Sequence, residues 1–324
     1  MKKLALTLVP LFLLAGCAAE PQQELTGYAL ISQGLTPTCE SYTTGTSVEQ
    51  VKVEGEFGTE PEVTFPTPLS GEGVETKIIS EGDGGVIVGS QRVALHFTGF
   101  NAGNGEPFQG SEFGSEEFII QDLIEGGQPD FCKALTGVKI GSRVAVLLSP
   151  EGAHGGAGIE SLNIGADEGV LFIFDVLDAY LPKANGDAKP AQAGMPTVIL
   201  APNGQPGIQI PAADAPAEFS SNALIEGKGE PIAIGDTVVV HYSGWTWDGT
   251  QFDSSWESEN RTPASFQVSQ DSLIEGFVQA LEGATVGSQI IAVIPPELGY
   301  GSSAQGSIPA DSTLIFVIDI LGKD

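Results

Sequence analysis

The sequence predicts an α+β protein of two domains, each an antiparallel β-sheet wrapped around one short α-helix. Its 324 residues are about twice the usual length of one domain. The 43 Gly and 21 Pro indicate many turns and short strands. Four sequence blocks also recur in the same order at a spacing of about 146 residues. This spacing is too long for a solenoid repeat and suits a tandem pair of globular domains.

The four repeated blocks set the domain limits. VALHFTGF at 93–100 corresponds to VVVHYSGW at 238–245, LIEG at 123–126 to 273–276, KIGSRVAVLLSPEGAHG at 139–155 to TVGSQIIAVIPPELGYG at 285–301, and VLFIFDVL at 170–177 to LIFVIDIL at 314–321. A segment rich in Pro, Gly, Ala and charge separates the two copies and is typical of a linker. We therefore predict domains at 46–181 and 193–324, with a linker at 182–192.

The second copy shows the predicted elements most clearly, in chain order. The β-branched run 237–242 predicts a strand, and Asp248-Gly249 then signals a turn. The sequence 272–275 has the Ser-x-x-Glu form of a capping box, and apolar residues at 274, 277 and 281 give a short helix one apolar face. Gly283 is a plausible end for this helix. Runs 289–294 and 314–321 predict two more strands, so several strands surround one helix.

Charge and motifs exclude several classes of function. The formal net charge of −29 argues against nucleic acid, whose affinity depends on Lys and Arg, and against a polybasic membrane surface. No His/Cys cluster has zinc spacing, and no glycine-rich loop has the P-loop pattern. We expect neither a metal nor a cofactor. Of the three histidines, His96 and His241 sit at matched strand positions and are expected to be structural.

The N-terminus predicts export. Lys2 and Lys3 precede a short apolar run that cannot span a bilayer, as in a signal peptide. The sequence at 14–17, Leu-Ala-Gly-Cys, resembles the lipobox of bacterial lipoproteins, which implies a signal peptide at 1–16 and lipidation of Cys17. An ordinary signal with a chance cysteine is the alternative. The polar segment 17–45 is interpreted as a flexible tether, and the expected location is extracytoplasmic, lipid-anchored to a bacterial cell membrane.

Two further cysteines, Cys39 and Cys132, would meet oxidising conditions outside the cytoplasm. We favour a disulfide between them, tying the tether to the first domain. Two free thiols, one of them buried, are the alternative, because sequence does not give the distance between the Cα atoms.

Two segments carry a specific resemblance. VVVHYSGWTWDGTQFDSSW at 238–256 and IPPELGYGSSAQGSIPADSTLIFVIDIL at 294–321 are similar to FKBP-type peptidyl-prolyl cis/trans isomerases. The likeness is close over about 236–324, and 83–178 resembles a degraded copy. It implies rotation about Xaa–Pro bonds, with no cofactor, assisting the folding of exported proteins. The implied partners are Xaa–Pro segments of exported or unfolded proteins and macrolide ligands of the FKBP pocket.

The resemblance also assigns residues. It implies catalytic roles for Asp253, as a buried carboxylate orienting polar groups, and for Tyr300, Phe252 and Ile274, with the Ile274 N–H and the Tyr300 hydroxyl binding substrate carbonyls. The substrate-binding walls would be Tyr242, Phe277, Ile308 and Phe316. Phe277 stands where the family often has Trp, and Ala264 stands where it has an aromatic residue, which should open that wall.

The first copy departs from this pattern at its polar positions. Phe97, Gln109 and His154 stand in place of the second copy's Tyr, Asp and Tyr, while Phe108, Ile124, Phe131 and Phe172 keep the apolar frame. We expect this domain to fold without efficient catalysis. A non-catalytic binding module or holdase at the cell surface is the alternative function, and an acidic structural surface protein is a third.

Overall fold

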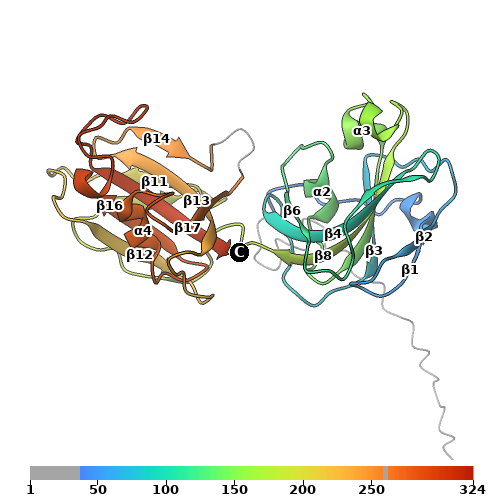
Figure 1. Cartoon of the computed structure of the whole chain (residues 1–324), viewed down its shortest axis with the longest axis horizontal. Helices are drawn as coiled ribbons and strands as arrows, with labels where there is room; N and C mark the ends of the chain where they lie inside the picture. The colour runs from blue at the N-terminus through green and yellow to red at the C-terminus, as the bar shows by residue number, and fades with distance from the viewer. Residues whose placement is uncertain (1–36, 258–261, 324) are drawn as a thin grey trace, which may run out of the picture.

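A computed structural model describes residues 37–257 and 262–323 and contains two separate large antiparallel sheets (Figure 1). The helices are few and the sheets antiparallel, which fits the α+β class. Each sheet has its own buried apolar clusters. The two sheets lie side by side along the long axis of the view, and the C-terminal end lies between them.

The first sheet has six strands in the order β3-β7-β8-β4-β5, with β6 also paired to β4. Its strands are β3 (Val74–Ser80), β4 (Arg92–Asn101), β5 (Pro107–Gly110), β6 (Ile119–Asp122), β7 (Arg143–Leu148) and β8 (Val170–Ala179). The helices beside it are α2 (Phe131–Leu135) and α3 (Pro150–His154), with 3₁₀ turns at Val48–Gln50 and Glu160–Leu162.

The second sheet has seven strands in the order β14-β13-β17-β16-β12-β9, with β15 also paired to β13. Its strands are β9 (Asp187–Ala188), β12 (Ser220–Glu226), β13 (Thr237–Thr246), β14 (Gln251–Ser254), β15 (Ala264–Gln267), β16 (Gln289–Ile294) and β17 (Leu314–Lys323). One helix, α4 (Glu275–Leu281), contacts β16, and a 3₁₀ turn follows at Pro296–Leu298.

The two sheets repeat each other in register. Gly99 on β4 lies opposite Phe172 on β8, and Gly244 on β13 lies opposite Phe316 on β17. A Cβ atom on Gly244 would lie 2.6 Å from Cζ of Phe252, and one on Gly99 would meet Phe108 at the same distance. Glycine is needed at both positions because the ring from the neighbouring strand crosses directly over the backbone.

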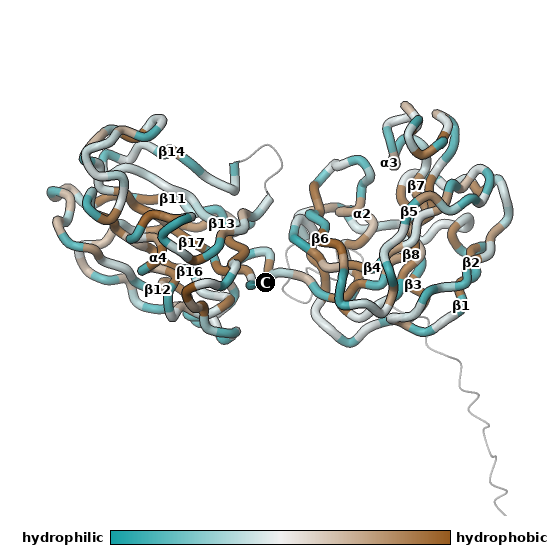
Figure 2. The backbone as a smooth tube through the Cα atoms, in the orientation of Figure 1, coloured by the Kyte–Doolittle hydropathy of each residue, from teal (hydrophilic) through white to brown (hydrophobic). Residues whose placement is uncertain are grey.

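A two-stranded hairpin covers the other face of each sheet. The hairpin β1 (Lys52–Glu54) and β2 (Glu62–Thr64) brings apolar side chains to one cluster, and β10 (Thr197–Leu200) with β11 (Pro206–Gln209) does so for the other. Each sheet is therefore buried on both faces, which explains why its central strands are nearly continuous apolar runs. Figure 2 shows these hydrophobic residues concentrated along the central strands of each half.

The second half follows most of the expected elements. The strand at 289–294 has the predicted bounds, and β13 and β17 extend the two other predicted strands. The capping-box prediction was wrong, because α4 begins at Glu275 with Ile274 as N-cap and no side-chain cap. A preceding turn, closed by the Leu273 N–H on the Ser269 carbonyl, delays the helix. Gly283, at φ +78°, ends it as predicted.

Two segments expected to be flexible are attached to the sheets. Residues 37–45 lie against the first sheet, where the Thr43 carbonyl accepts from the Thr76 N–H at 3.0 Å. In the linker at 182–192, Ala184 is buried and its N–H donates to a carboxylate oxygen of Asp319 at 2.9 Å. Strand β9 within this linker pairs with β12. Backbone hydrogen bonding therefore overrides the flexible composition of both segments.

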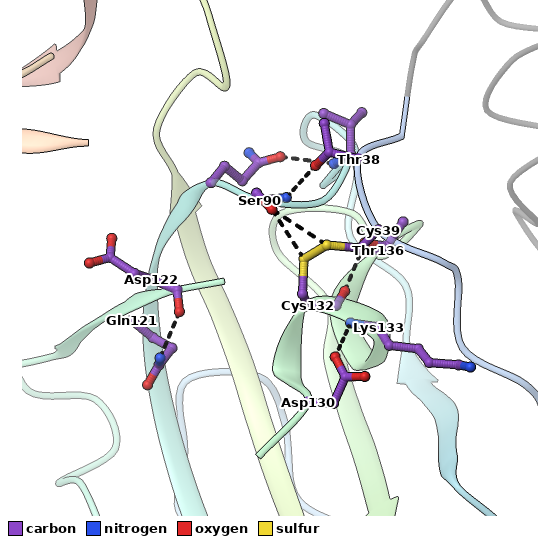
Figure 3. Close-up of a disulfide and its surroundings, with 11 residues drawn as sticks. Thr38, Cys39, Ser90, Gln121, Asp122, Asp130, Cys132, Lys133 and Thr136 are labelled. Carbon is purple, nitrogen blue, oxygen red and sulfur yellow. Dashed lines mark hydrogen bonds between the residues drawn. A yellow bond between two sulfur atoms is a disulfide. The ribbon is translucent and has the colours of Figure 1, made fainter. Parts of the chain in front are cut away.

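A disulfide joins Cys39 to Cys132 on α2, with Cα atoms 6.0 Å apart (Figure 3). The Ser90 hydroxyl lies 3.6 Å from one sulfur and 3.8 Å from the other. The bridge fixes the N-terminal segment to the helix of the first half. The predicted signal peptide at 1–16, Cys17 and the predicted tether up to residue 36 lie outside the described residues. Among the residues that the structure describes, no helix is long and apolar enough to cross a membrane.

Candidate active site

A hollow of about 630 Å³ with aromatic walls opens between the second sheet and α4. Strand β13 supplies Tyr242, β14 supplies Phe252, α4 supplies Phe277 and β17 supplies Phe316. The rings meet edge to face, with centroids 5.0 Å apart for Phe277 and Phe316 and 5.5 Å apart for Phe252 and Phe316. This volume and lining suit a small apolar ligand or a short peptide segment.

Two polar groups face each other at one side of the hollow. The Tyr242 hydroxyl donates to Oδ2 of Asp253 at 2.5 Å. Burial first, and then this hydrogen bond, raise the pKa of Tyr242 well above its ordinary value, so the phenol remains a donor at neutral pH. The prediction that Asp253 is buried was wrong. Its side chain is exposed, because β14 is the edge strand of the sheet. Its carboxylate is held by Tyr242 and stays open to solvent.

Two hydrogen-bond donors, the Tyr300 hydroxyl and the Ile274 N–H, belong to residues that line the hollow. Tyr300 is 36% exposed, and its hydroxyl has no hydrogen-bond partner within residues 37–257 and 262–323. The Ile274 N–H, at the N-cap of α4, likewise has no acceptor in that part of the chain. Both groups are therefore free to bind carbonyl oxygens, the role that the sequence resemblance implied.

The structure brings most of the expected residues together and adds others. Tyr242, Phe252, Asp253, Ile274, Phe277, Tyr300 and Phe316 all line the hollow. Ile308 does not; it lies in the core cluster at 6% exposure. Ala264 is not a lining residue either, and Phe266 forms the wall on that strand. The two-residue alternation along β15 places 264 and 266 on one face, and this signal could have identified Phe266.

The paired strand histidines are structural, as expected. The His241 ring stacks on Trp256 with centroids 4.0 Å apart, and Nδ1 lies 2.9 Å from the Ser255 hydroxyl. Burial lowers the pKa of His241 to about 4, so the ring is neutral at physiological pH. His96 makes the matching contact with Ser111 at 3.3 Å. Among the described residues no group of His, Cys, Asp and Glu could hold a metal ion.

An antiparallel sheet packed on one short helix, with an aromatic floor and polar groups around it, defines an α+β class of protein whose hollow suits a short apolar peptide segment. A family model described as FKBP-type peptidyl-prolyl cis-trans isomerase matches residues 228–321. The chain belongs to this family, whose members rotate Xaa–Pro amide bonds.

Relatives and solved structures show how far this likeness extends. FK506-binding protein 1 of Aspergillus oryzae is 37% identical over 107 residues, which are 30% of this chain and 91% of the relative. FK506-binding protein of Streptomyces anulatus is 36% identical over 36% of this chain and 95% of its own. FKBP-type peptidyl-prolyl cis-trans isomerase FkpA of Escherichia coli is 42% identical over 29% of this chain and 34% of the relative. The three FKBP domains of wheat FKBP73 superpose with a TM-score of 0.35 at 20% identity, covering 78% of this chain and 95% of that one.

Proposed function

We propose that the peptidyl-prolyl isomerase activity of this chain resides in a C-terminal domain, residues 193–324, and that residues 46–181 form a second, inactive FKBP-like domain. The supporting observation is the aromatic hollow, with the Tyr242–Asp253 pair at its side and the free Tyr300 hydroxyl at its mouth. All of its lining residues fall within the range that the family model matches.

The hollow can lower the barrier to amide rotation without bond chemistry. Rotation costs about 18–20 kcal/mol because it breaks amide resonance. Four aromatic rings remove water from a bound prolyl amide, which disfavours the planar, charge-separated form relative to the twisted one. The Tyr300 hydroxyl and the Ile274 N–H then hold the flanking carbonyls in the twisted arrangement, which is differential binding of the transition state.

The first half retains the apolar frame of this site, and the residue that replaces Tyr300 forms its hydrogen bonds within the chain. Nδ1 of His154, which stands in place of Tyr300, accepts from the Gly158 N–H at 2.9 Å, and Nε2 lies 2.8 Å from the Glu168 carbonyl oxygen. Gln109 pairs opposite Gly99, as Asp253 pairs opposite Gly244, but carries no acid. No donor equivalent to the Tyr300 hydroxyl is therefore free at this position.

A four-residue insertion before α2, at 127–130, is hydrogen-bonded to α3 in the first half. The Asp130 N–H donates to the Gly152 carbonyl at 3.1 Å, and the Gln128 amide reaches the Glu151 carbonyl at 3.5 Å. In the second half the equivalent loop and helix start both line the open hollow. These bonds support our proposal that residues 46–181 do not isomerise prolyl bonds.

The test measures cis–trans exchange of a short Ala-Pro peptide by NMR with the full chain. Asp253→Ala and Tyr300→Phe each remove a hydrogen bond worth about 1–3 kcal/mol and should reduce the catalysed rate by about 5- to 150-fold, whereas Gln109→Ala, the matched change in the first half, should not. Full activity in both of the first two variants would refute the pocket assignment. A folded chain with no catalysis at all would instead support a binding module.

We also propose that the chain is an exported lipoprotein, with a signal peptide at 1–16, lipidation at Cys17, and exported or unfolded proteins with Xaa–Pro segments as its clients. This proposal rests on the 14–17 motif. Macrolides are a second ligand class, because two relatives are named for binding FK506. Membrane fractionation of cells expressing the chain or Cys17→Ser tests the anchor, and an unchanged membrane fraction in the variant would contradict it.

A further inference from the structure

Four carboxylates surround the mouth of the proposed isomerase pocket. Asp253 stands on β14, Asp271 on the turn before α4, Glu275 at the start of α4 and Glu297 on the 3₁₀ turn after β16. All four are exposed and all four line the hollow. They come from three parts of the fold, namely β14, the start of α4 with the turn before it, and the 3₁₀ turn after β16, so the acidic lining is not confined to one segment.

No described cation balances this rim. The described basic residues of the second half are engaged elsewhere: Lys189 with Glu226, Lys228 with Asp187, Lys323 with Glu230 and Asp236, and Lys183 with the Pro202 carbonyl. Within 37–257 and 262–323, none of the four rim carboxylates forms an ion pair, and no Lys or Arg lines the hollow.

The rim and the floor therefore recognise different parts of one ligand. The aromatic floor takes an apolar ring such as that of proline, and the rim favours positive charge on the residues beside it. We infer that this pocket selects Xaa–Pro segments that carry Lys or Arg next to the proline. This inference rests on the proposed function, because the site is the isomerase pocket itself and the carboxylates set its specificity.

The acidity of the whole chain is the competing explanation, since a net charge of −29 attracts any cation. The two explanations differ in where the charge must be. The long-range field of the chain follows its net charge, which the removal of any two carboxylates changes by the same amount. Preference for Lys or Arg set at the pocket instead requires the carboxylates that line it. Asp271 and Glu297 are suited to the test, because no described hydrogen bond or ion pair depends on either side chain.

The experiment compares three peptides that are identical except for Lys, Ala or Glu on both sides of an Ala-Pro core. Exchange catalysed by the full chain is measured by NMR at about 0.01 M and about 1 M salt, where the Debye lengths are roughly 30 and 3 Å. We expect kcat/KM to fall in the order Lys, Ala, Glu, with about a tenfold or larger span at low salt. The span should nearly vanish at high salt.

Paired variants locate the effect. Asp271→Asn with Glu297→Gln should reduce the Lys-to-Glu ratio severalfold. The control, Asp214→Asn with Glu282→Gln, removes the same formal charge from exposed sites outside the hollow and should keep the ratio. Equal rates for all three peptides, or an equal loss in the control, would overturn the inference. Failure to catalyse exchange of any peptide would overturn the proposed function as well, so the two failures are distinguishable.

Discussion

Substituting Gly244 with Ala should separate the two halves of this chain by function. Gly244 has no positive φ, so its backbone tolerates a Cβ. That Cβ would lie 2.6 Å from Cζ of Phe252 and 2.9 Å from Cε1 of Phe316. Carbon atoms in contact prefer about 3.5–4.0 Å, so the Phe252 ring must move by roughly 1 Å. Phe252 is a wall of the hollow, and the displacement falls on the proposed site.

Both the stability and the activity effects of this substitution have a rough magnitude. Overpacking of this kind costs about 1–3 kcal/mol. At roughly 4 °C per kcal/mol, the melting temperature should fall by about 4–12 °C. A misplacement of about 1 Å at a binding wall can cost on the order of a hundredfold in rate. The isomerisation rate should therefore fall far more than the folded fraction.

Gly99→Ala is the matched control, because its Cβ would lie 2.6 Å from Cζ of Phe108 in the first half. Its stability cost should be similar, with isomerisation unchanged. Peptide exchange by NMR measures the rate, and circular dichroism follows both halves. Tryptophan fluorescence reports the second half alone, since Trp245, Trp247 and Trp256 are the only tryptophans of the chain. Wild-type activity in Gly244→Ala, or equal activity losses in both variants, would refute this reasoning.

Three further predictions concern buried groups. Burial raises the pKa of Asp319 to about 6, above its unfolded value near 3.8. The stability that the protonated carboxyl contributes is therefore present below about pH 4 and is lost as pH rises through 6. Urea unfolding followed by tryptophan fluorescence should show a loss on the order of 3 kcal/mol over this range, and Asp319→Asn should not show it. Arg143→Met strands the buried Asp175 carboxylate, bonded at 2.6 Å, and should cost about 3–5 kcal/mol; circular dichroism should show earlier melting while tryptophan fluorescence is unchanged, and equal shifts in both signals would contradict it. Cys39→Ser with Cys132→Ser opens a loop of 93 residues and should cost about 4–5 kcal/mol by chain entropy; calorimetry that shows no loss would argue against a formed bridge.

The repeat in the sequence predicted the central sheets well, because strand pairing depends on residues that both copies share. Apolar blocks in the same order imply the same register, and Gly99 and Gly244 occupy equivalent positions. The aromatic walls followed from the same alignment. The sequence also located the turn at Asp248-Gly249, where Gly249 adopts φ +89° and an Asp248 carboxylate oxygen accepts from the Thr250 N–H.

The remaining features depend on contacts between distant segments. The hairpins β1–β2 and β10–β11 lie outside the repeated blocks, and their short apolar runs become strands only by covering a sheet. The linker has a flexible composition, yet the buried Asp319 carboxylate holds it through the Ala184 N–H. The exposure of Asp253 depends on β14 being an edge strand, which no local pattern reveals.

Comparison of the two halves supports the proposal that hydrogen-bonding groups, rather than the aromatic frame, distinguish the active half. Phe108 against Phe172 repeats Phe252 against Phe316, with centroids 5.7 and 5.5 Å apart. This apolar frame is therefore a packing requirement of the fold, present whether or not a half is catalytic, and aromatic residues alone do not indicate activity. The difference lies in the hydrogen-bonding groups. In one half His154 is hydrogen-bonded within the chain, and at the matching position of the other half the Tyr300 hydroxyl has no partner among the described residues. An activity that depends on a free donor over an apolar floor should therefore belong to the second half.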